Sequence, residues 1–358
     1  MKATTNHIRQ ALAVNPTPPQ SSRGAAPALL ALCLCAALPA AANPEGAQVV
    51  EGAAVIQATS AARLDVLQQS ERAVIAWRQF SIGAGEHTHF QQPSAEAVAL
   101  NRVVGRDPSA ILGQLTANGR VFLVNPAGIL FGSGSRVDVA GLVATAADIP
   151  NEDFMAGRYD FSRAAPPGAA VVNQGAITVG EGGAAALVAP WVRNDGAIVA
   201  TLGRVALASG DTFTLDLHGD GLVQLALGPE AAARLRDTPQ GVANEGRISA
   251  PGGTVVLSAA GAGAALDAVV SVNGVVEARN ASVDRAGRII LSAAAGTVEV
   301  GGRLDAGGAT GGEIRVEGAG VRVGESAVLA ADAAGSGDGG RIETLAAGDA
   351  NVAGTLSA

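Results

Sequence analysis

The chain has 358 residues with 24 basic and 32 acidic side chains, which gives a formal net charge of −8 at pH 7. An acidic chain whose only lysine is Lys2 is a poor match for nucleic acid or an anionic lipid surface, so the composition argues against both as partners. The 48 glycines and the aromatic content of 3% also argue against a globular core built from bulky side chains.

Residues 1–42 are predicted to be a removable export signal. An apolar stretch over 28–38 follows a basic segment, and small residues then lead to a cleavage site between Ala42 and Asn43. A membrane anchor is the competing interpretation, but the apolar stretch is short for a span and ends at Pro39. A lipoprotein site at Cys33 would need a small residue at the position of Leu32.

Cleavage would change both the charge and the cysteine content. The remaining chain would carry 21 basic and 32 acidic residues, a net charge of −11, and no cysteine, because Cys33 and Cys35 lie inside the signal. The lack of cysteine fits either a chain that stays unfolded through an oxidising compartment or a fold that needs no disulfide. No later segment holds 18 uninterrupted apolar residues, so no second membrane span is expected.

The most informative block covers residues 97–146. Apolar residues 121–124 run into the turn Asn125-Pro126-Ala127-Gly128-Ile129, and a second apolar run leaves it at once. Proline presets φ for the second position of a tight turn, and the preceding asparagine can close the turn through its side chain. The pattern therefore predicts two strands joined by a tight corner.

Further motifs surround this corner in a fixed order between about residues 45 and 162. They are Trp77-x-x-Phe80-x-Ile82-Gly83, Phe90-Gln91-Gln92-Pro93-Ser94, Leu100-Asn101-Arg102-Val103, Asp107-Pro108-Ser109-x-Ile111-x-Gly113 and Asn151-x-Asp153-Phe154-x-x-Gly157-Arg158-Tyr159-x-Phe161. Together they resemble the N-terminal secretion domain of the filamentous haemagglutinin family, also called the haemagglutination activity domain, whose members leave Gram-negative bacteria by two-partner secretion.

Two departures from the family pattern are visible. The usual Asn-Pro-Asn-Gly turn has Ala127 in its third place, and the family's second Asn-Pro-Asn-Leu motif has no match. Gly128 still supplies a permissive backbone, so the corner can survive the first change. The turn has two interpretations, a corner that fixes strand register or a signal for the transporter, and residue physics favours the first.

Residues 43–165 are therefore predicted to be the core of the secretion domain, and residues 166–358 to continue it as repeated coils. A turn residue followed by a short β run recurs from 173 onwards, with asparagine before the glycine at positions that include Asn173, Asn194, Asn244 and Asn273. A period near 20 with strand-only units predicts a right-handed parallel β-helix with an N-terminal capping region. We expect the asparagines to form a ladder. An immunoglobulin-like sandwich is the rival fold, but it needs a bulkier core.

The chain stops in the middle of a predicted coil, so we expect the front of a longer protein or a truncated member. Uneven spacing between the later repeats predicts inserted loops, and residues 230–235 are a candidate short helix.

Candidate chemical sites are few, and each has a simpler explanation. Asp216, His218 and Asp220 would share one face of a strand, but a solvated strand end is the expected state. His87 and His89 beside Glu86 lack a third metal ligand and are expected in a surface loop. One glycine-rich stretch, 335–340, is too short to predict a calcium repeat, and Asp284, Asp305 and Asp332 show no catalytic pairing. No cofactor or enzymatic activity is therefore predicted.

The resemblance implies a secreted or surface-exposed exoprotein with adhesin or haemagglutinin activity, exported through the periplasm by a dedicated outer-membrane β-barrel transporter with periplasmic docking domains. A host-cell surface or glycan ligand is the implied target. The alternatives are a pore-forming haemolysin or contact-dependent inhibition toxin, and a polysaccharide-active β-helix enzyme. In this interpretation Asn125 to Ile129 form the secretion motif, and Trp77, Phe80, Gly83, Asn101 and Arg102 are structural positions.

Overall fold

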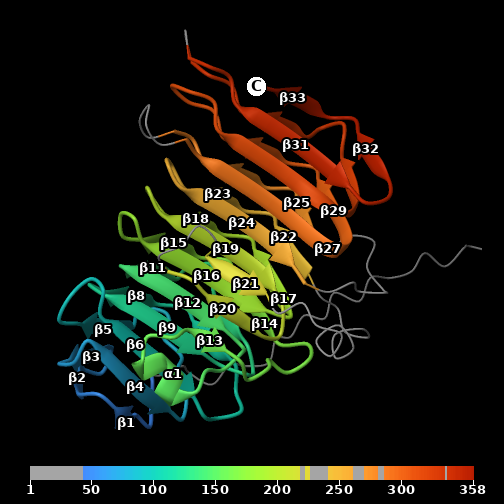
Figure 1. Ribbon diagram of the computed structural model, residues 1–358. Helices are drawn as coiled ribbons and strands as arrows, with labels where there is room; N and C mark the ends of the chain where they lie inside the picture. The colour runs from blue at the N-terminus through green and yellow to red at the C-terminus, as the bar shows by residue number, and fades with distance from the viewer. Residues whose placement is uncertain (1–42, 218–221, 226–240, 261–269, 281–285, 335–336) are drawn as a thin grey trace, which may run out of the picture. The chain divides into compact units, whose positions relative to one another are not determined.

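The computed structural model describes residues 43–217, 222–225, 241–260, 270–280, 286–334 and 337–358. The described chain is nearly all β, and its strands stack in sequence order from the N-terminal to the C-terminal coils (Figure 1). Successive coils contribute strands to three faces, and on each face a strand pairs in parallel with its counterpart one coil later. This arrangement is the parallel β-helix that the sequence predicted.

The first face is the broadest because its strands are the longest. It consists of β4 (Arg72–Trp77), β6 (Val98–Val103), β9 (Arg120–Val124), β12 (Gly141–Thr145), β16 (Ala184–Ala189), β19 (Arg204–Ser209), β24 (Thr254–Ala259), the first parts of β27 (Arg288–Val300) and β29 (Glu313–Val323), and β31 (Arg341–Ala346).

The second face consists of shorter strands. They are β7 (Ser109–Ile111), β10 (Ile129–Phe131), β14 (Ala170–Asn173), β17 (Trp191–Asn194), β22 (Gly241–Asn244), β25 (Val270–Val272), the last parts of β27 and β29, and β32 (Ala350–Val352).

The third face completes each coil. It consists of β3 (Arg63–Gln68), β5 (His87–Gln91), β8 (Gln114–Ala117), β11 (Arg136–Val139), β15 (Ala176–Val179), β18 (Ala197–Val199), β23 (Arg247–Ser249), β26 (Val275–Glu277), β28 (Arg303–Asp305), β30 (Val328–Ala330) and β33 (Thr355–Ser357).

Two antiparallel strands cap the N-terminal end of the stack. β1 (Gln48–Glu51) pairs with β4 at the edge of the first face, and β2 (Ala54–Ser60) pairs with β3 at the edge of the third. An exposed sheet edge offers unpaired N–H and C=O groups to other chains, so these strands protect the start of the helix. The capping region that the sequence predicted is therefore confirmed.

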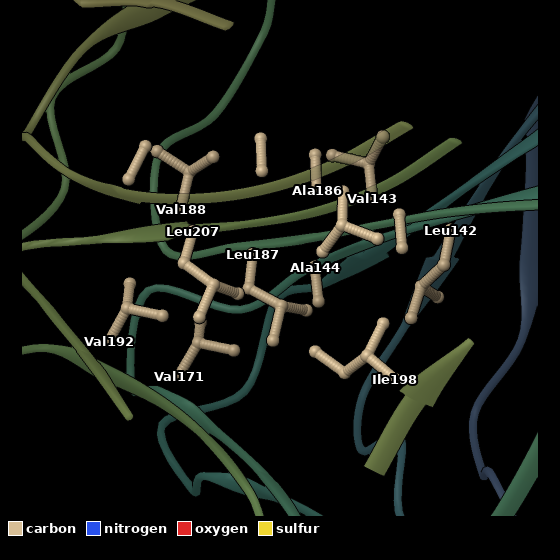
Figure 2. Close-up of a cluster of buried hydrophobic side chains, with 14 of the residues drawn as sticks. Leu142, Val143, Ala144, Val171, Ala186, Leu187, Val188, Val192, Ile198 and Leu207 are labelled. Carbon is tan, nitrogen blue, oxygen red and sulfur yellow. The ribbon is translucent and has the colours of Figure 1, made fainter. Parts of the chain in front are cut away.

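Alternation along each strand fills the interior of the helix. Leu142, Leu187 and Leu207 point from the first face towards Val171 and Ile198 on the other two, and all are buried (Figure 2). Small and medium aliphatic side chains suffice here because each coil covers the apolar surface of its neighbour. The glycine- and alanine-rich composition is thus compatible with a continuous core.

A cover of other elements lies outside the first face. It comprises α1 (Asn151–Met155) and an antiparallel sheet of β13 (Asp160–Phe161), β20 (Phe213–Leu215) and β21 (Val223–Leu225). These elements come from two insertions, one between β12 and β14 and the other between β19 and β22. None of the sequence motifs predicted this cover. No helix among the described residues is long and apolar enough to cross a membrane.

The expected asparagine ladder has three rungs, not four. Asn173 Nδ2 donates to Asn194 Oδ1 at 2.8 Å, and Asn194 Nδ2 donates to Asn244 Oδ1 at 2.7 Å. In the next coil Val272 pairs with Asn244, so Asn273 stands one residue later, is exposed and donates to Glu245. A shift of one residue turns a side chain to the opposite face of a strand, so including Asn273 in the ladder was wrong.

Replacing Asn194 by alanine should lower the free energy of unfolding by about 1–3 kcal/mol, because it removes one hydrogen bond from each of the two buried amides next to it in the ladder. The matched change Asn273→Ala removes an exposed side chain and should stay within about 0.5 kcal/mol of the wild type. Urea denaturation of both variants would measure the difference, and equal losses would contradict the three-rung ladder.

Candidate functional site

The predicted secretion motif is a closed turn between β9 and β10. The Gly128 N–H donates to the Asn125 carbonyl at 2.9 Å, and the Ala127 N–H donates to Asn125 Oδ1 at 2.9 Å. The asparagine therefore closes the turn through both its backbone and its side chain, as the sequence suggested. The Ala127 side chain takes no part in this closure, so the turn forms without the family's third-position amide.

Asn125 also ties its turn to the preceding coil. Its Nδ2 donates to the Asp107 carbonyl at 3.0 Å and to Ser109 Oγ at 2.9 Å. The side chain is completely buried, while Pro126 and Ala127 are half-buried. Gly128 has a φ of +104°, and a Cβ there would stand 2.9 Å from the Ala170 carbonyl oxygen, so the next coil leaves room only for glycine.

The family-like positions Trp77, Phe80 and Asn101 lie in the interior of the first coils. Trp77 Nε1 donates to Asn101 Oδ1 at 2.9 Å, and the Trp77 and Phe80 rings meet edge to face with centroids 5.4 Å apart. Gly83 is also buried, and its N–H donates to Glu86 Oε2 at 2.6 Å. A buried indole N–H needs an acceptor, which explains why an asparagine stands among apolar residues at 101.

Arg102 has a different position, because it points outwards from the first face. Its Nε donates to Asp148 Oδ1 at 2.8 Å, and its Nη1 donates to Asn151 Oδ1 at 2.6 Å at the start of α1. Asp148 also pairs with Arg163 at 3.1 Å. Arg102 therefore connects the start of the cover to the first face of the β-helix.

Aromatic rings fill the space between the cover and the first face. Phe122 points outwards from β9, and its ring centroid lies 6.0 Å from that of Phe154 and 5.2 Å from that of Tyr159. Phe161 of β13 stacks on Phe213 of β20 with centroids 4.4 Å apart and planes 8° apart. The two insertions thus share one aromatic cluster, although more than 50 residues separate these two phenylalanines.

The predicted cleavage site lies at the boundary of the described residues. Ala42 lies outside the described residues, whereas Asn43 is the first described residue and accepts a hydrogen bond from Thr88 Oγ1 at 3.2 Å. Cleavage between them stays a prediction.

The other candidate sites are only partly described. His218, Asp220, Asp284, residues 230–235 and part of the stretch 335–340 lie outside the described residues, and Asp216 directly follows β20. Asp305 is buried and pairs with Arg279 and Arg303, each at 2.9 Å. In the described part of the chain, no three His, Cys, Asp or Glu residues lie close enough to hold a metal ion.

His87 and His89 lie in β5 and not in a loop, which corrects the expectation from sequence. Arg63 Nη1 is 3.2 Å from His87 Nδ1, so this nitrogen accepts a hydrogen bond and the proton of neutral His87 is assigned to Nε2. His87 Nε2 then donates to Thr116 Oγ1 at 2.7 Å, and the Thr116 hydroxyl donates to His89 Nδ1 at 2.8 Å. A chain of hydrogen bonds fixes both rings.

This arrangement predicts a pH dependence of stability. Burial lowers the pKa of His87, and the charges of Arg63 and His89 lower it further. His87 is therefore harder to protonate in the folded protein than in the unfolded chain. Its contribution to the free energy of unfolding is complete above about pH 6.5 and is lost as the pH falls towards the folded-state pKa. His87→Gln should therefore flatten the change in urea midpoint between pH 7 and 5. The same slope in both proteins would contradict this prediction.

The described structure defines a class of protein, a capped parallel β-helix whose first coils are covered on one face. Sequence comparison identifies the family: the TPS secretion domain matches residues 40–306, and the chain belongs to this family. It is 35% identical over 290 residues to a heme/hemopexin-binding protein of Haemophilus influenzae, an alignment that covers 74% of this chain and 30% of that protein. The chain therefore spans about 30% of the length of this relative.

A solved structure of a secretion domain has the same fold. The secretion domain of HMW1 from Haemophilus influenzae matches with a TM-score of 0.65 and 22% identity, covering 88% of this chain and all of that one. The secretion domain of filamentous hemagglutinin matches with a TM-score of 0.44 and 16% identity, covering 88% of this chain and 98% of that one. Because the TPS secretion domain matches residues 40–306, the chain is a TPS secretion domain of a two-partner secretion exoprotein, as the motifs implied.

Proposed function

We propose that this chain directs export of its protein through a dedicated outer-membrane β-barrel transporter with periplasmic docking domains. The observation that carries this proposal is the TPS secretion domain, which covers the capping strands, the Asn125 turn and most of the coils. Export places the protein in the medium or on the surface of a Gram-negative cell.

Because the motif is buried after folding, a transporter could bind it only while the chain is unfolded. Asn125 is inaccessible in the folded protein and its turn is held by three coils, so recognition through this residue would precede folding. Folding outside the cell would then bury the apolar faces of the coils and favour forward transport.

The test is co-expression of residues 1–358 with and without the cognate barrel protein. The chain should reach the medium only when the barrel is present, and otherwise remain in the periplasm in a protease-sensitive form. Equal secretion from a strain that lacks such a barrel would refute the proposal.

The turn itself provides a prediction. Asn125→Ala should cost about 1–3 kcal/mol, because it leaves the Ala127 N–H and Ser109 Oγ without their partner. If the turn acts only as a structural corner, export should fall no further than in a Leu123→Ala variant of equal stability, which alters the same strand. A selective export defect in Asn125→Ala would instead indicate recognition of the asparagine.

For the whole protein we propose capture of haem or hemopexin in place of the adhesin activity expected from sequence. The supporting observation is the identity of 35% to a protein named for heme and hemopexin binding. That name describes binding and not catalysis, which also supports the prediction that the chain is not an enzyme. Hemopexin pull-down with the complete gene product would test this proposal, and an exported product that binds neither haem nor hemopexin would refute it without affecting the export proposal.

A further inference from the structure

A small pocket lies between the cover and the edge of the first face, and none of its lining residues belongs to the secretion motif. Its volume is 250 Å³, and its lining includes Arg72 of β4, Arg120 of β9, Glu96, and Gly157 and Tyr159 of the cover. β6 separates the two arginines, and Val98 pairs with both, so the arginines share one column of the face. Two positive side chains therefore flank one opening.

Within the described part of the chain, neither Arg72 nor Arg120 has an ion-pair partner. The Nε of Arg72 is buried and has no hydrogen-bond acceptor. A buried donor without a partner is costly, and such a group in a folded protein points to a missing water molecule, ion or ligand.

Gly157 of the cover lies close to this guanidinium group. Gly157 has a φ of +75°, and a Cβ at this position would lie 2.9 Å from Arg72 Nη2. Any larger residue would therefore meet the arginine head. Tyr159, the only tyrosine in the sequence, is 8% exposed, and within the described residues its hydroxyl has no hydrogen-bond partner. Two guanidinium groups and one hydroxyl thus supply unused donors to the same small space.

The acidic lining restricts the chemistry of the ligand. Glu96 and Asp216 also line the pocket, and Asp216 already interacts with another residue. The two carboxylates repel a dianion such as phosphate more strongly than a monoanion, so the lining favours a monoanion. Glu96 can accept hydrogen bonds only from a ligand that also carries donors.

We propose that this pocket binds a hydroxylated carboxylic acid of the size of one sugar ring, such as a uronic acid. The carboxylate would bind Arg72 and Arg120, because planar guanidinium groups match carboxylates well. The ligand hydroxyls would donate to Glu96, and the Tyr159 hydroxyl would donate to the ligand. This site is independent of the export function, because none of these residues belongs to the secretion motif.

The test measures binding to the purified protein. Glucuronate should raise the melting temperature in a saturable way, because a ligand that binds only the folded state stabilises it. Sodium chloride at equal ionic strength and uncharged glucose are the comparison solutes, and neither should do so. Isothermal titration calorimetry would give the Kd directly.

Three arginine variants make the test specific. Arg120→Met should weaken glucuronate binding at least about tenfold, as should Arg72→Met, since each removes a charged donor. Arg136→Met removes an exposed arginine on the third face and should leave the Kd unchanged. Because calorimetry reports binding at a temperature where each variant is folded, loss of stability is separable from loss of the site.

Several results would overturn the proposal. A glucuronate response no larger than that to sodium chloride would show that the pocket holds water alone. Unchanged affinity in Arg120→Met would show that binding occurs elsewhere. Tighter binding of inorganic phosphate than of glucuronate would refute the assignment to a hydroxylated monocarboxylate.

Discussion

Replacing Phe122 by alanine is expected to lower the free energy of unfolding by about 3–5 kcal/mol. Phe122 is 1% exposed although it points away from the interior of the β-helix, because Phe154, Tyr159 and Phe161 of the cover surround it. The substitution would leave a cavity between two layers that cannot close without moving the cover. Thermal or urea unfolding of the variant would measure the loss.

Ile290→Ala provides a matched control within the same column of the first face. Strand pairing connects Phe122 to Ile290 through Val143, Ala186, Ala206 and Val256. Ile290 is half-buried, so its truncation should cost about 1 kcal/mol. Equal effects at both positions would mean that the cover adds little to stability.

The same column explains why the cover was missed. In residues 121–124 and 141–144 both alternating sets are apolar or small, and such continuous runs are typical of strands buried on both faces. Later strands alternate, and at Arg315 and Glu343 the outward column becomes charged. The outward column is therefore apolar in the first coils and charged in the last ones, and a comparison of the coils residue by residue would have revealed this difference.

The coils themselves could be predicted because their determinants are local. Each turn glycine and each alternating run is repeated, so the strand pattern and the asparagine rungs at 173, 194 and 244 follow from short windows of sequence. The prediction that Asn273 joins the ladder was wrong because the repeats were aligned on asparagine. The backbone register follows the glycines at 246 and 274 instead.

No repeated sequence pattern predicts the contacts between distant segments. The stacking of Phe161 on Phe213 and the clamp from Arg102 to Asp148 join parts of the chain that have no shared repeat. The cover also combines residues on both sides of position 165, where the sequence analysis placed the end of the core domain; that boundary stays a prediction.

A disulfide between neighbouring coils is expected to stop export almost completely. Asp138 of β11 and Thr178 of β15 are exposed register partners on the third face. Neighbouring strands lie about 4.8 Å apart, which suits a disulfide. Because the chain after residue 42 contains no cysteine, the double change Asp138→Cys and Thr178→Cys allows only one intramolecular pair in the mature protein.

Oxidation in the periplasm would close a loop of 40 residues in the variant before it reaches the outer membrane. If the chain crosses as a single extended strand and folds only outside, this loop cannot follow it through the barrel. Each single-cysteine variant should be exported normally, and a reducing agent should restore export of the double variant. Undiminished release of a chain that was already oxidised in the periplasm would instead show that the domain crosses in a compact state, and the coupling of coil stacking to transport would then be wrong.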